Sequence, residues 1–284
     1  MNRGRRRSSV IAVLPMYLFT LAFVLGPLIY MLFLSFESRS GQWGVTADFT
    51  LRNYTRIAEP LFMKTFWNST KLALISTVFV LLIGYPFGYF MARLSKKWRS
   101  VCMLLLIIPF WTSALMRLYG WIIFFRANGV LDTLLMKIGL IDRPLKLLYS
   151  YPSVVVGMVY VLLPFMIYSV YASAEKLDWR LVEAARDLGA SRFGAFRTVS
   201  LPLTAPGIFS GVILTFVPSM GLYFLADILG GNKTILVGNL IYEQLMKIHD
   251  WPFAAAISVV LLLLTSIFLF AYRRITKSDL EGLV

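Results

Sequence analysis

Six long apolar runs limit what this chain can fold into more than any other feature of its sequence. A helix that crosses about 30 Å of hydrocarbon needs about 20 mainly apolar residues, because each residue adds about 1.5 Å. The runs that meet this length are residues 10–36, 70–92, 101–125, 153–172, 205–226 and 253–272. They predict an all-α polytopic membrane protein with six transmembrane helices, and we expect residues 1–284 to form a single transmembrane domain.

The first run follows four arginines between residues 3 and 7, a charge pattern that also precedes the apolar core of a signal peptide. The run is longer than the roughly 7–15 residues of such a core, and no convincing cleavage site accompanies it. We therefore expect it to be retained as the first transmembrane helix. Prolines inside the runs, such as Pro86, Pro109 and Pro218, predict kinked helices.

Positive charge is distributed unevenly between the polar intervals that separate the runs. One alternate set of intervals, which includes both termini and the interval around Glu183, holds sixteen of the 28 Lys and Arg residues in the shorter total length. Cytoplasmic loops carry an excess of these bases. We therefore expect both termini to be cytoplasmic, and the short basic loop from Arg93 to Arg99 is the clearest marker of that side.

Several classes of function are excluded or disfavoured by what the sequence lacks. The net charge of +14 is scattered through short loops and lines no single face, so we expect no nucleic-acid partner. The single cysteine, Cys102, lies in an apolar run and is expected to pack there, and the single histidine, His249, has no metal-ligand companion. No nucleophile–base pair is evident, which predicts a protein without catalytic or metal-binding residues.

The interval from Glu183 to Gly189 carries the most informative polar pattern. Apolar residues at helical spacing form one face of a short helix and charged residues form the other: Leu181, Val182, Ala184, Ala185 and Leu188 against Arg180, Glu183, Arg186 and Asp187. Gly189 suits a left-handed helix end, and Ser191 suits the N-cap of a second short helix toward Leu201-Pro202. Two interpretations stay open at this point: a compact knob that another protein docks on, or a solvated loop helix folded against its own domain.

The intervals on the opposite side are longer than simple turns require. Residues 49–54 combine aromatic and polar side chains, Asn128-Gly129 predicts a turn into an amphipathic helix that ends near Gly139, and residues 230–232 predict a tight turn. These intervals form either a platform for an external partner or helices at the membrane surface, and both interpretations fit. Glu243 and Asp250 are expected at this outer surface.

The interval around Glu183 resembles the EAA-type loop of ABC importer permeases, in which Glu-Ala-Ala, a Gly four residues after the second Ala, and a later Leu-Pro recur. The resemblance extends over most of the chain, from about residue 53 to 253, and is to the B-type permease subunits of bacterial spermidine/putrescine importers. It rests on these stretches: Asn53-Tyr54, Gly84-Tyr85-Pro86, Pro109-Phe110-Trp111-Thr112, Leu163-Pro164-Phe165-Met166, residues 181–191, and Asp250-Trp251-Pro252.

The resemblance implies the type I ABC importer permease fold in a bacterial inner membrane. It implies partners as well: a second permease subunit, an ATPase dimer that binds ATP and Mg, an extracytoplasmic substrate-binding protein, a polyamine substrate and membrane lipid. This chain has no glycine-rich phosphate loop, so no cofactor is expected in it. The cytoplasmic coupling loop would be about residues 173–204, and the residues expected to couple to the ATPase are Glu183, Ala184, Ala185, Asp187 and Gly189.

A polyamine pathway needs local acids and aromatic rings, because loop charges are screened over about 8 Å at physiological salt. The candidates are Asp227 and Tyr223 near the outer end of the fifth run, with Trp111 and Tyr160 from other runs. The alternatives are that Asp227 reaches interfacial water and that the rings belong to an interfacial belt. Arg117 lies inside the third run and either pairs with an acid such as Asp227 or reaches water at the outer interface.

Two alternative functions stay open at this point. The chain could instead be a permease for another small organic solute. An ion-gradient-driven carrier is less well supported, because such carriers need ionisable residues deep in several spans and Arg117 is the one clear candidate.

Overall fold

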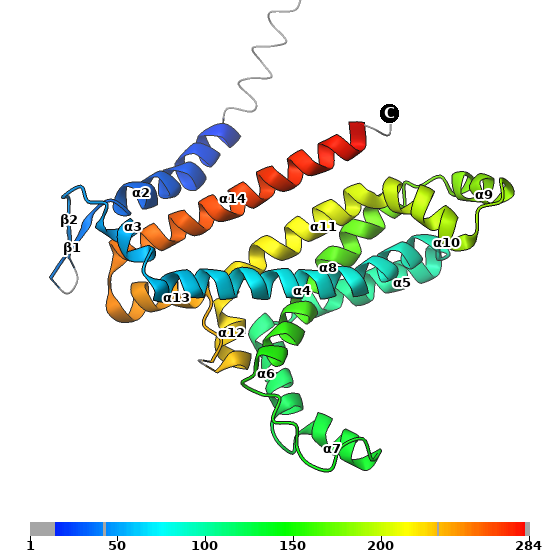
Figure 1. Cartoon of the computed structure of the whole chain (residues 1–284), viewed down its shortest axis with the longest axis horizontal. Coiled ribbons are helices and arrows are strands. Elements are labelled where there is room, and N and C mark those ends of the chain that lie inside the picture. The colour runs from blue at the N-terminus through cyan, green and yellow to red at the C-terminus, as the bar shows by residue number, and fades with distance from the viewer. Residues whose placement is uncertain (1–14, 42–43, 232, 282–284) are drawn as a thin grey trace, which may run out of the picture. The chain divides into compact units, whose positions relative to one another are not determined.

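The computed structural model describes residues 15–41, 44–231 and 233–281, and helices dominate this part of the chain (Figure 1). The elements in chain order are η1 (Leu21–Leu25), α2 (Gly26–Leu34), β1 (Ser38–Ser40), β2 (Gly44–Thr46), α3 (Arg52–Ile57), α4 (Pro60–Arg93), α5 (Lys96–Ile107), η2 (Ile108–Trp111), α6 (Ala114–Phe125), α7 (Val130–Lys137), α8 (Tyr151–Ala174), α9 (Trp179–Asp187), α10 (Arg192–Ala195), η3 (Phe196–Ser200), α11 (Leu201–Gly221), α12 (Tyr223–Gly230), α13 (Val237–Glu243), η4 (Gln244–Ile248) and α14 (Trp251–Glu281).

Within the described ranges, five helices are long and apolar enough to cross a membrane. They are Pro15–Leu34, Pro60–Arg93, Tyr151–Ala174, Arg192–Gly221 and Trp251–Tyr272. A sixth candidate is a bent pair, Lys96–Trp111 with Ala114–Lys137. The predicted all-α polytopic membrane fold is therefore confirmed, with five spans or six if the bent pair counts as one. The arginines before the first helix lie outside the described residues.

The third apolar run is not the single helix that the sequence predicted over residues 101–125. Its two parts meet at 94°, and the chain between them is extended, with ψ of 149° at Thr112 and 133° at Ser113. Pro109 precedes the break in a 3-10 turn and supplies no amide hydrogen, so the helix is already weakened there. The hydropathy of the sequence shows how long an apolar run is, but it does not show such a break within the run.

The fifth run also ends earlier than predicted. The helix stops at Gly221, and Leu222 leaves the helical region with ψ of 60° before a new helix, α12, begins. Asp227 therefore belongs to α12 and not to the end of the spanning helix. The apolar run continues across the break because α12 is itself largely apolar.

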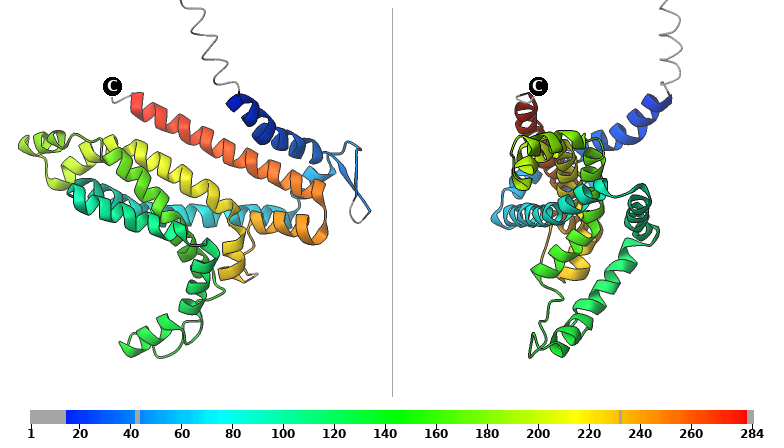
Figure 2. Two further views of the ribbon diagram at one scale, coloured as in Figure 1. Left: turned by 180° about the vertical axis from the view of Figure 1, so that it is seen from behind. Right: turned by 90° about the vertical axis from the view of Figure 1, so that its right-hand side faces the viewer.

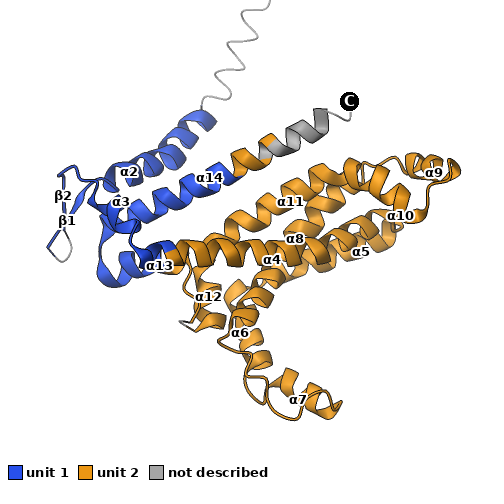
Figure 3. Ribbon diagram, in the orientation of Figure 1, with its two compact units in different colours: residues 1–63, 240–268 blue, residues 64–239, 269–284 orange. Residues whose placement is uncertain are grey.

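The described chain divides into two compact units, residues 1–63 with 240–268 and residues 64–239 with 269–284 (Figure 3). In unit 1, a hairpin pairs β1 with β2, with Arg39 opposite Val45. Next to the hairpin in sequence, Asn53 of α3 donates two hydrogen bonds through its side-chain amide, to the carbonyls of Ser35 and Glu37 at 3.0 and 2.9 Å. These bonds fix the chain where the first spanning helix ends.

The core of unit 2 is built around α8. Helix α11 runs beside α8 in Figure 1 and Figure 2, and α12 and α6 pack on the same helix. Among the fully buried side chains of this core are residues from α4, α6, α8 and α12: Leu72, Leu118, Met158, Leu225 and Leu229. In lipid such contacts act through van der Waals packing, because lipid tails are as apolar as the side chains.

Small residues let α4 and α11 approach α8 closely. A methyl group added at Gly88 would lie 2.7 Å from the carbonyl oxygen of Ile167, and one at Gly207 would lie 2.7 Å from that of Ser169. Both neighbours are backbone atoms that cannot move aside without shifting a helix. The three helices therefore depend on glycine at these crossings, as membrane helix pairs commonly do.

Candidate functional site

The predicted coupling segment is a short helix with capped ends. Helix α9 starts after Asp178, whose carboxylate accepts a hydrogen bond from the amide of Arg180 at 3.0 Å. It ends at Asp187, and Gly189, two residues later, has a φ of +92°. Because a side chain is disfavoured at that φ, glycine is the residue expected there, and the predicted left-handed helix end is confirmed.

The second short helix of the segment begins as predicted but does not end at Leu201-Pro202. Ser191 caps α10 by accepting a hydrogen bond from the amide of Gly194 at 3.0 Å. From there α10 continues through the π-helical turn η3 into α11, and the whole stretch Arg192–Gly221 forms one long helix. The coupling segment is therefore joined to a spanning helix without a hinge on that side.

The exposed face of the segment carries the predicted coupling residues together with uncovered apolar side chains. Glu183, Ala184, Asp187 and Gly189 are exposed and Ala185 is half-buried. Leu188, at the end of the apolar face of this helix, is 90% exposed. Leu181 of the same face is 50% exposed, so the described chain leaves part of this apolar face uncovered, and both the docking and the loop-helix interpretation stay open.

Beneath this face, aromatic side chains tie α9 and η3 to α4. We call Tyr85, Tyr89, Trp179 and Phe196 the aromatic anchor. The ring of Tyr89 lies 5.4 Å from that of Trp179 and 5.6 Å from that of Phe196, both edge to face. Arg93, at the end of α4, places its guanidinium 5.0 Å from the Trp179 ring.

Hydrogen bonds between hydroxyls reinforce the aromatic anchor. The oxygens of Tyr89 and Ser200 are 2.8 Å apart, and those of Tyr85 and Thr204 are 3.0 Å apart. Each pair links α4 to the continuous η3–α11 stretch. The sequence analysis missed this cluster, although the spacing of Tyr85 and Tyr89 by four residues on one helix face was an available signal.

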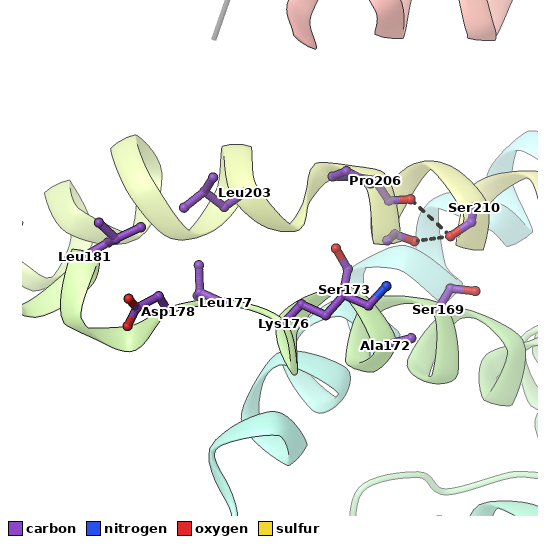
Figure 4. A pocket seen from close by; sticks show the side chains of 11 residues that line it. Ser169, Ala172, Ser173, Lys176, Leu177, Asp178, Leu181, Leu203, Pro206 and Ser210 are labelled. Atoms are coloured by element: carbon purple, nitrogen blue, oxygen red, sulfur yellow. Dashed lines mark hydrogen bonds between the residues drawn. The ribbon is translucent and has the colours of Figure 1, made fainter. Parts of the chain in front are cut away.

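On its other side, the segment is held by an ion pair and lies next to a cavity. Arg99 of α5 forms an ion pair with Glu175, the residue after α8, at 2.8 Å. Between the end of α8, the start of α9 and α11 lies a cavity of about 590 Å³, lined by serines of α8 and α11 and by Lys176, Asp178 and Leu181 (Figure 4). The connection from α8 to α9 is thus less tightly packed than the side that faces the aromatic anchor.

Two of the predicted pathway residues share one helix face. Tyr223 and Asp227 are four residues apart on α12, and both are exposed. The Asp227 carboxylate forms no hydrogen bond or ion pair with any residue the structure describes. The start of α12 is held by Asn239, whose side-chain amide donates to the carbonyl of Tyr223 at 3.1 Å.

The other two pathway candidates lie in different surroundings. Trp111 ends η2 at the break in the bent pair and is 78% exposed. Tyr160 of α8 is half-buried and packs edge to face on Trp121 at 5.5 Å. Within the described ranges, no hydrogen bond or ion pair joins the Asp227 side chain to Trp111 or Tyr160, whereas Tyr223 and Asp227 share one face of α12.

Arg117 of α6 lies beside Tyr160 and does not pair with Asp227. Its guanidinium carbon is 5.7 Å from the Phe110 ring and 5.9 Å from the Tyr160 ring. Its Nε and Nη1 atoms are buried and have no hydrogen-bond partner among the described residues. The predicted alternative of a pair with Asp227 is therefore wrong for this structure, because no ion pair joins the two residues.

Asp250 is not at the outer surface, contrary to the prediction for this residue. Its side chain is only 8% exposed and forms an ion pair with Arg56 at 2.8 Å, while its second oxygen accepts from the amide of Phe253 at 3.2 Å. The Arg56 guanidinium also lies 3.8 Å from the Phe253 ring. Asp250 therefore caps the start of α14 and holds α3 against it within unit 1.

Comparison with known proteins relates the chain to membrane components of transport systems. Residues 84–277 match the family model described as "Binding-protein-dependent transport system inner membrane component". The chain is 43% identical over 255 residues to the spermidine/putrescine transport system permease proteins PotB of Haemophilus influenzae and Escherichia coli, covering 90% of this chain and 89% and 93% of those proteins.

Among solved structures, a chain of a bacterial alginate ABC transporter in complex with an alginate pentasaccharide-bound periplasmic protein is similar in fold. The TM-score is 0.77 at 18% identity, and the match covers 96% of each chain. At this identity the likeness concerns the fold alone.

Proposed function

The chain belongs to the family of binding-protein-dependent transport system inner membrane components, and from this premise we propose that it is a permease subunit of an ATP-driven importer that carries spermidine and putrescine into the bacterial cytoplasm. The single observation that carries the proposal is the 43% identity over 90% of the chain to permeases named for spermidine/putrescine transport. The alternative within the same family is another small organic solute.

The working assembly we propose contains this chain, a second permease subunit, an ATPase dimer and an extracytoplasmic binding protein. ATP and Mg bind to the ATPase dimer, and this chain supplies no cofactor. Both termini and the α9–η3 segment face the cytoplasm in the inner membrane, in keeping with the bias of Lys and Arg. The intervals that contain α3, α7 and α13 then lie on the outer side of the membrane.

The exposed face of α9 is the proposed contact with the ATPase. Glu183, Ala184, Ala185, Asp187 and Gly189 would lie in its groove, since small residues allow close backbone approach and Leu188 gains an apolar cover. Closure of the ATPase pair would move this segment. The movement would reach α11 through the continuous helix and α4 through the aromatic anchor, a two-state change biased by nucleotide.

The substrate pathway we propose uses the exposed face of α12. The Asp227 carboxylate pairs with a substrate ammonium, and the Tyr223 ring adds cation–π contact of about 0.5–2 kcal/mol. Trp111 and Tyr160 are proposed as weaker contacts, although the Tyr160 ring already has the Arg117 guanidinium beside it. Several weak contacts suit a transporter because the substrate must also leave.

Uptake into vesicles that contain the complete assembly tests the function. Labelled spermidine or putrescine is added with the binding protein, with and without ATP, to wild type and to Glu183→Lys. We expect ATP-dependent uptake in wild type, and in the variant a loss of at least tenfold in substrate moved per ATP hydrolysed, because the reversed charge disturbs the ATPase contact.

The exposed loop acid Asp142 provides the matched control, Asp142→Lys, which should transport normally. If wild-type vesicles accumulate neither polyamine but import another solute with ATP, the proposed substrate is wrong and the family function stands. Glu183→Lys transporting at the wild-type rate would remove the coupling role of α9.

A further inference from the structure

Arg117 carries a permanent charge that no residue in the described part of the chain neutralises. It lies on α6, five residues after the 94° break, in a segment that is part of a candidate membrane span. Arginine stays protonated in proteins, so it cannot escape the cost of burial by losing its charge. In the described part of the chain, no acid forms an ion pair with it.

The surroundings of the guanidinium leave one edge open. Nε and Nη1 are buried without partners, and the Phe110 and Tyr160 rings lie within 6 Å of the central carbon. Ring faces offer such N–H groups only weak acceptors. Nη2 is not among the buried atoms, and it is therefore the atom at which a strong acceptor can bind.

The acids of neighbouring elements are otherwise engaged or do not reach this site. Both oxygens of Asp132 in α7 are used, since they accept from the amides of Asn128 and Leu145 at 3.0 and 3.2 Å. Asp227 is exposed on α12, which packs on α6, yet it makes no ion pair with Arg117. Among the described residues, therefore, no acid supplies the counter-charge in this structure.

We propose that Arg117, held between Phe110 and Tyr160, is one half of a charge pair that bridges the two permease subunits, and that the other half is a carboxylate of the second subunit. A polyamine is unsuitable as the partner because it is a cation. A carboxylate matches the planar guanidinium in both charge and geometry. The proposal rests on the two-permease assembly proposed above.

The first test compares Arg117→Met with Arg143→Met in the full assembly. Methionine keeps an apolar stem beside the two rings but removes the charge, and Arg143 is an exposed loop arginine. We expect Arg117→Met to reduce ATP-dependent uptake at least tenfold and to lower recovery of the second permease subunit on purification. Arg143→Met should match wild type in both measurements.

The second test identifies the partner. Each Asp and Glu in the membrane segments of the second subunit is changed to Asn or Gln, alone and together with Arg117→Met. One of these changes should by itself reproduce the loss of uptake, and it should cause no further loss when combined with Arg117→Met. Exchanging the two charges, with Arg117→Glu and the partner acid changed to Arg, should raise uptake at least fivefold above that of the single variants.

A third measurement separates folding from bridging. The full chain produced without its partner should melt at a temperature no lower with Arg117→Met than as wild type, because the substitution breaks no ion pair among the described residues and removes a buried unpaired charge. A lower melting temperature, a loss of uptake with no coupled carboxylate, or a defect that tracks the content of anionic lipid in the vesicles would each overturn the proposal. If wild-type chains fail to recover a second permease at all, the proposed assembly fails instead.

Discussion

The aromatic anchor and the α6/α12 region of unit 2 differ in how far the chain completes its own interactions. In the aromatic anchor, Tyr89 of α4 has a hydroxyl partner and three ring neighbours, two of which come from α9 and η3. In the α6/α12 region, Arg117 and Asp227 carry charges that no described residue pairs. The aromatic anchor is therefore completed by folding, whereas the α6/α12 region keeps two charges that the described chain does not pair.

This difference predicts two kinds of defect. Substitutions in the aromatic anchor should destabilise the protein itself, because they leave cavities and unpaired hydroxyls. Substitutions of the unpaired charges should leave folding unchanged and alter only what the assembled transporter does. Each prediction below measures folding and uptake together, so that either kind of defect can be recognised.

The largest effect on folding is expected for Tyr89→Ala. The half-buried ring would be lost from contacts with Trp179 and Phe196, and Ser200 would lose its hydroxyl partner. We expect a cost of about 2–3 kcal/mol, because a fully buried aromatic ring costs about 3–5 kcal/mol on removal. The melting temperature of the purified assembly should fall by several degrees, and the amount of substrate taken up per ATP hydrolysed should fall with it.

Tyr89→Phe is the matched control for this prediction. It keeps the ring and removes only the hydrogen bond to Ser200, so about 1 kcal/mol is expected. Equal destabilisation by the two substitutions would mean that the rings contribute nothing and that the hydroxyl pair alone ties α4 to η3.

A smaller effect, on uptake alone, is expected for Asp227→Asn. The substitution removes a charge that has no partner in the described chain, so the melting temperature should stay at the wild-type value. Loss of one ammonium contact of about 1–2 kcal/mol corresponds to a decrease in uptake efficiency of about 5- to 30-fold. Labelled spermidine uptake at several substrate concentrations measures it.

Asp142→Asn, at an exposed loop position, serves as the control for Asp227→Asn. Unchanged uptake in Asp227→Asn would make Asp227 an acid that only faces water. A lower melting temperature would instead mean that Asp227 contributes to folding, as the residues of the aromatic anchor do.

The sequence predicted the helices well where length and hydropathy decide the outcome. The spans at α4, α8 and α14 follow from their apolar runs, and the caps at Ser191 and Gly189 follow from local backbone chemistry. The break at Thr112 was not predicted, because Pro109 inside an apolar run is compatible with both a kink and a full turn of the chain.

Tertiary partners account for the remaining errors in the site. Nothing local distinguishes Asp250, which is buried against Arg56, from an exposed loop acid, because the two residues are 194 positions apart. The aromatic anchor combines residues of α4, α9 and η3, and no single segment contains it. The short helix α9 and its caps were therefore predictable from local pattern, whereas the contacts that hold this helix were not.

The smallest effect is expected at the ion pair between Arg99 and Glu175, and it tests whether charge adds to the aromatic anchor. The side chains are 27% and 45% exposed, so water and salt screen the pair and about 0.2–1 kcal/mol is expected for either single neutralisation. Arg99→Glu with Glu175→Arg should restore the wild-type melting temperature, whereas each single reversal should lower it slightly at low salt and less at high salt. If a single reversal costs as much as Tyr89→Ala, the α5–α8 contact is as important as the rings. The coupling segment would then be held from two sides, and the loosely packed connection near the cavity would not be its weaker attachment.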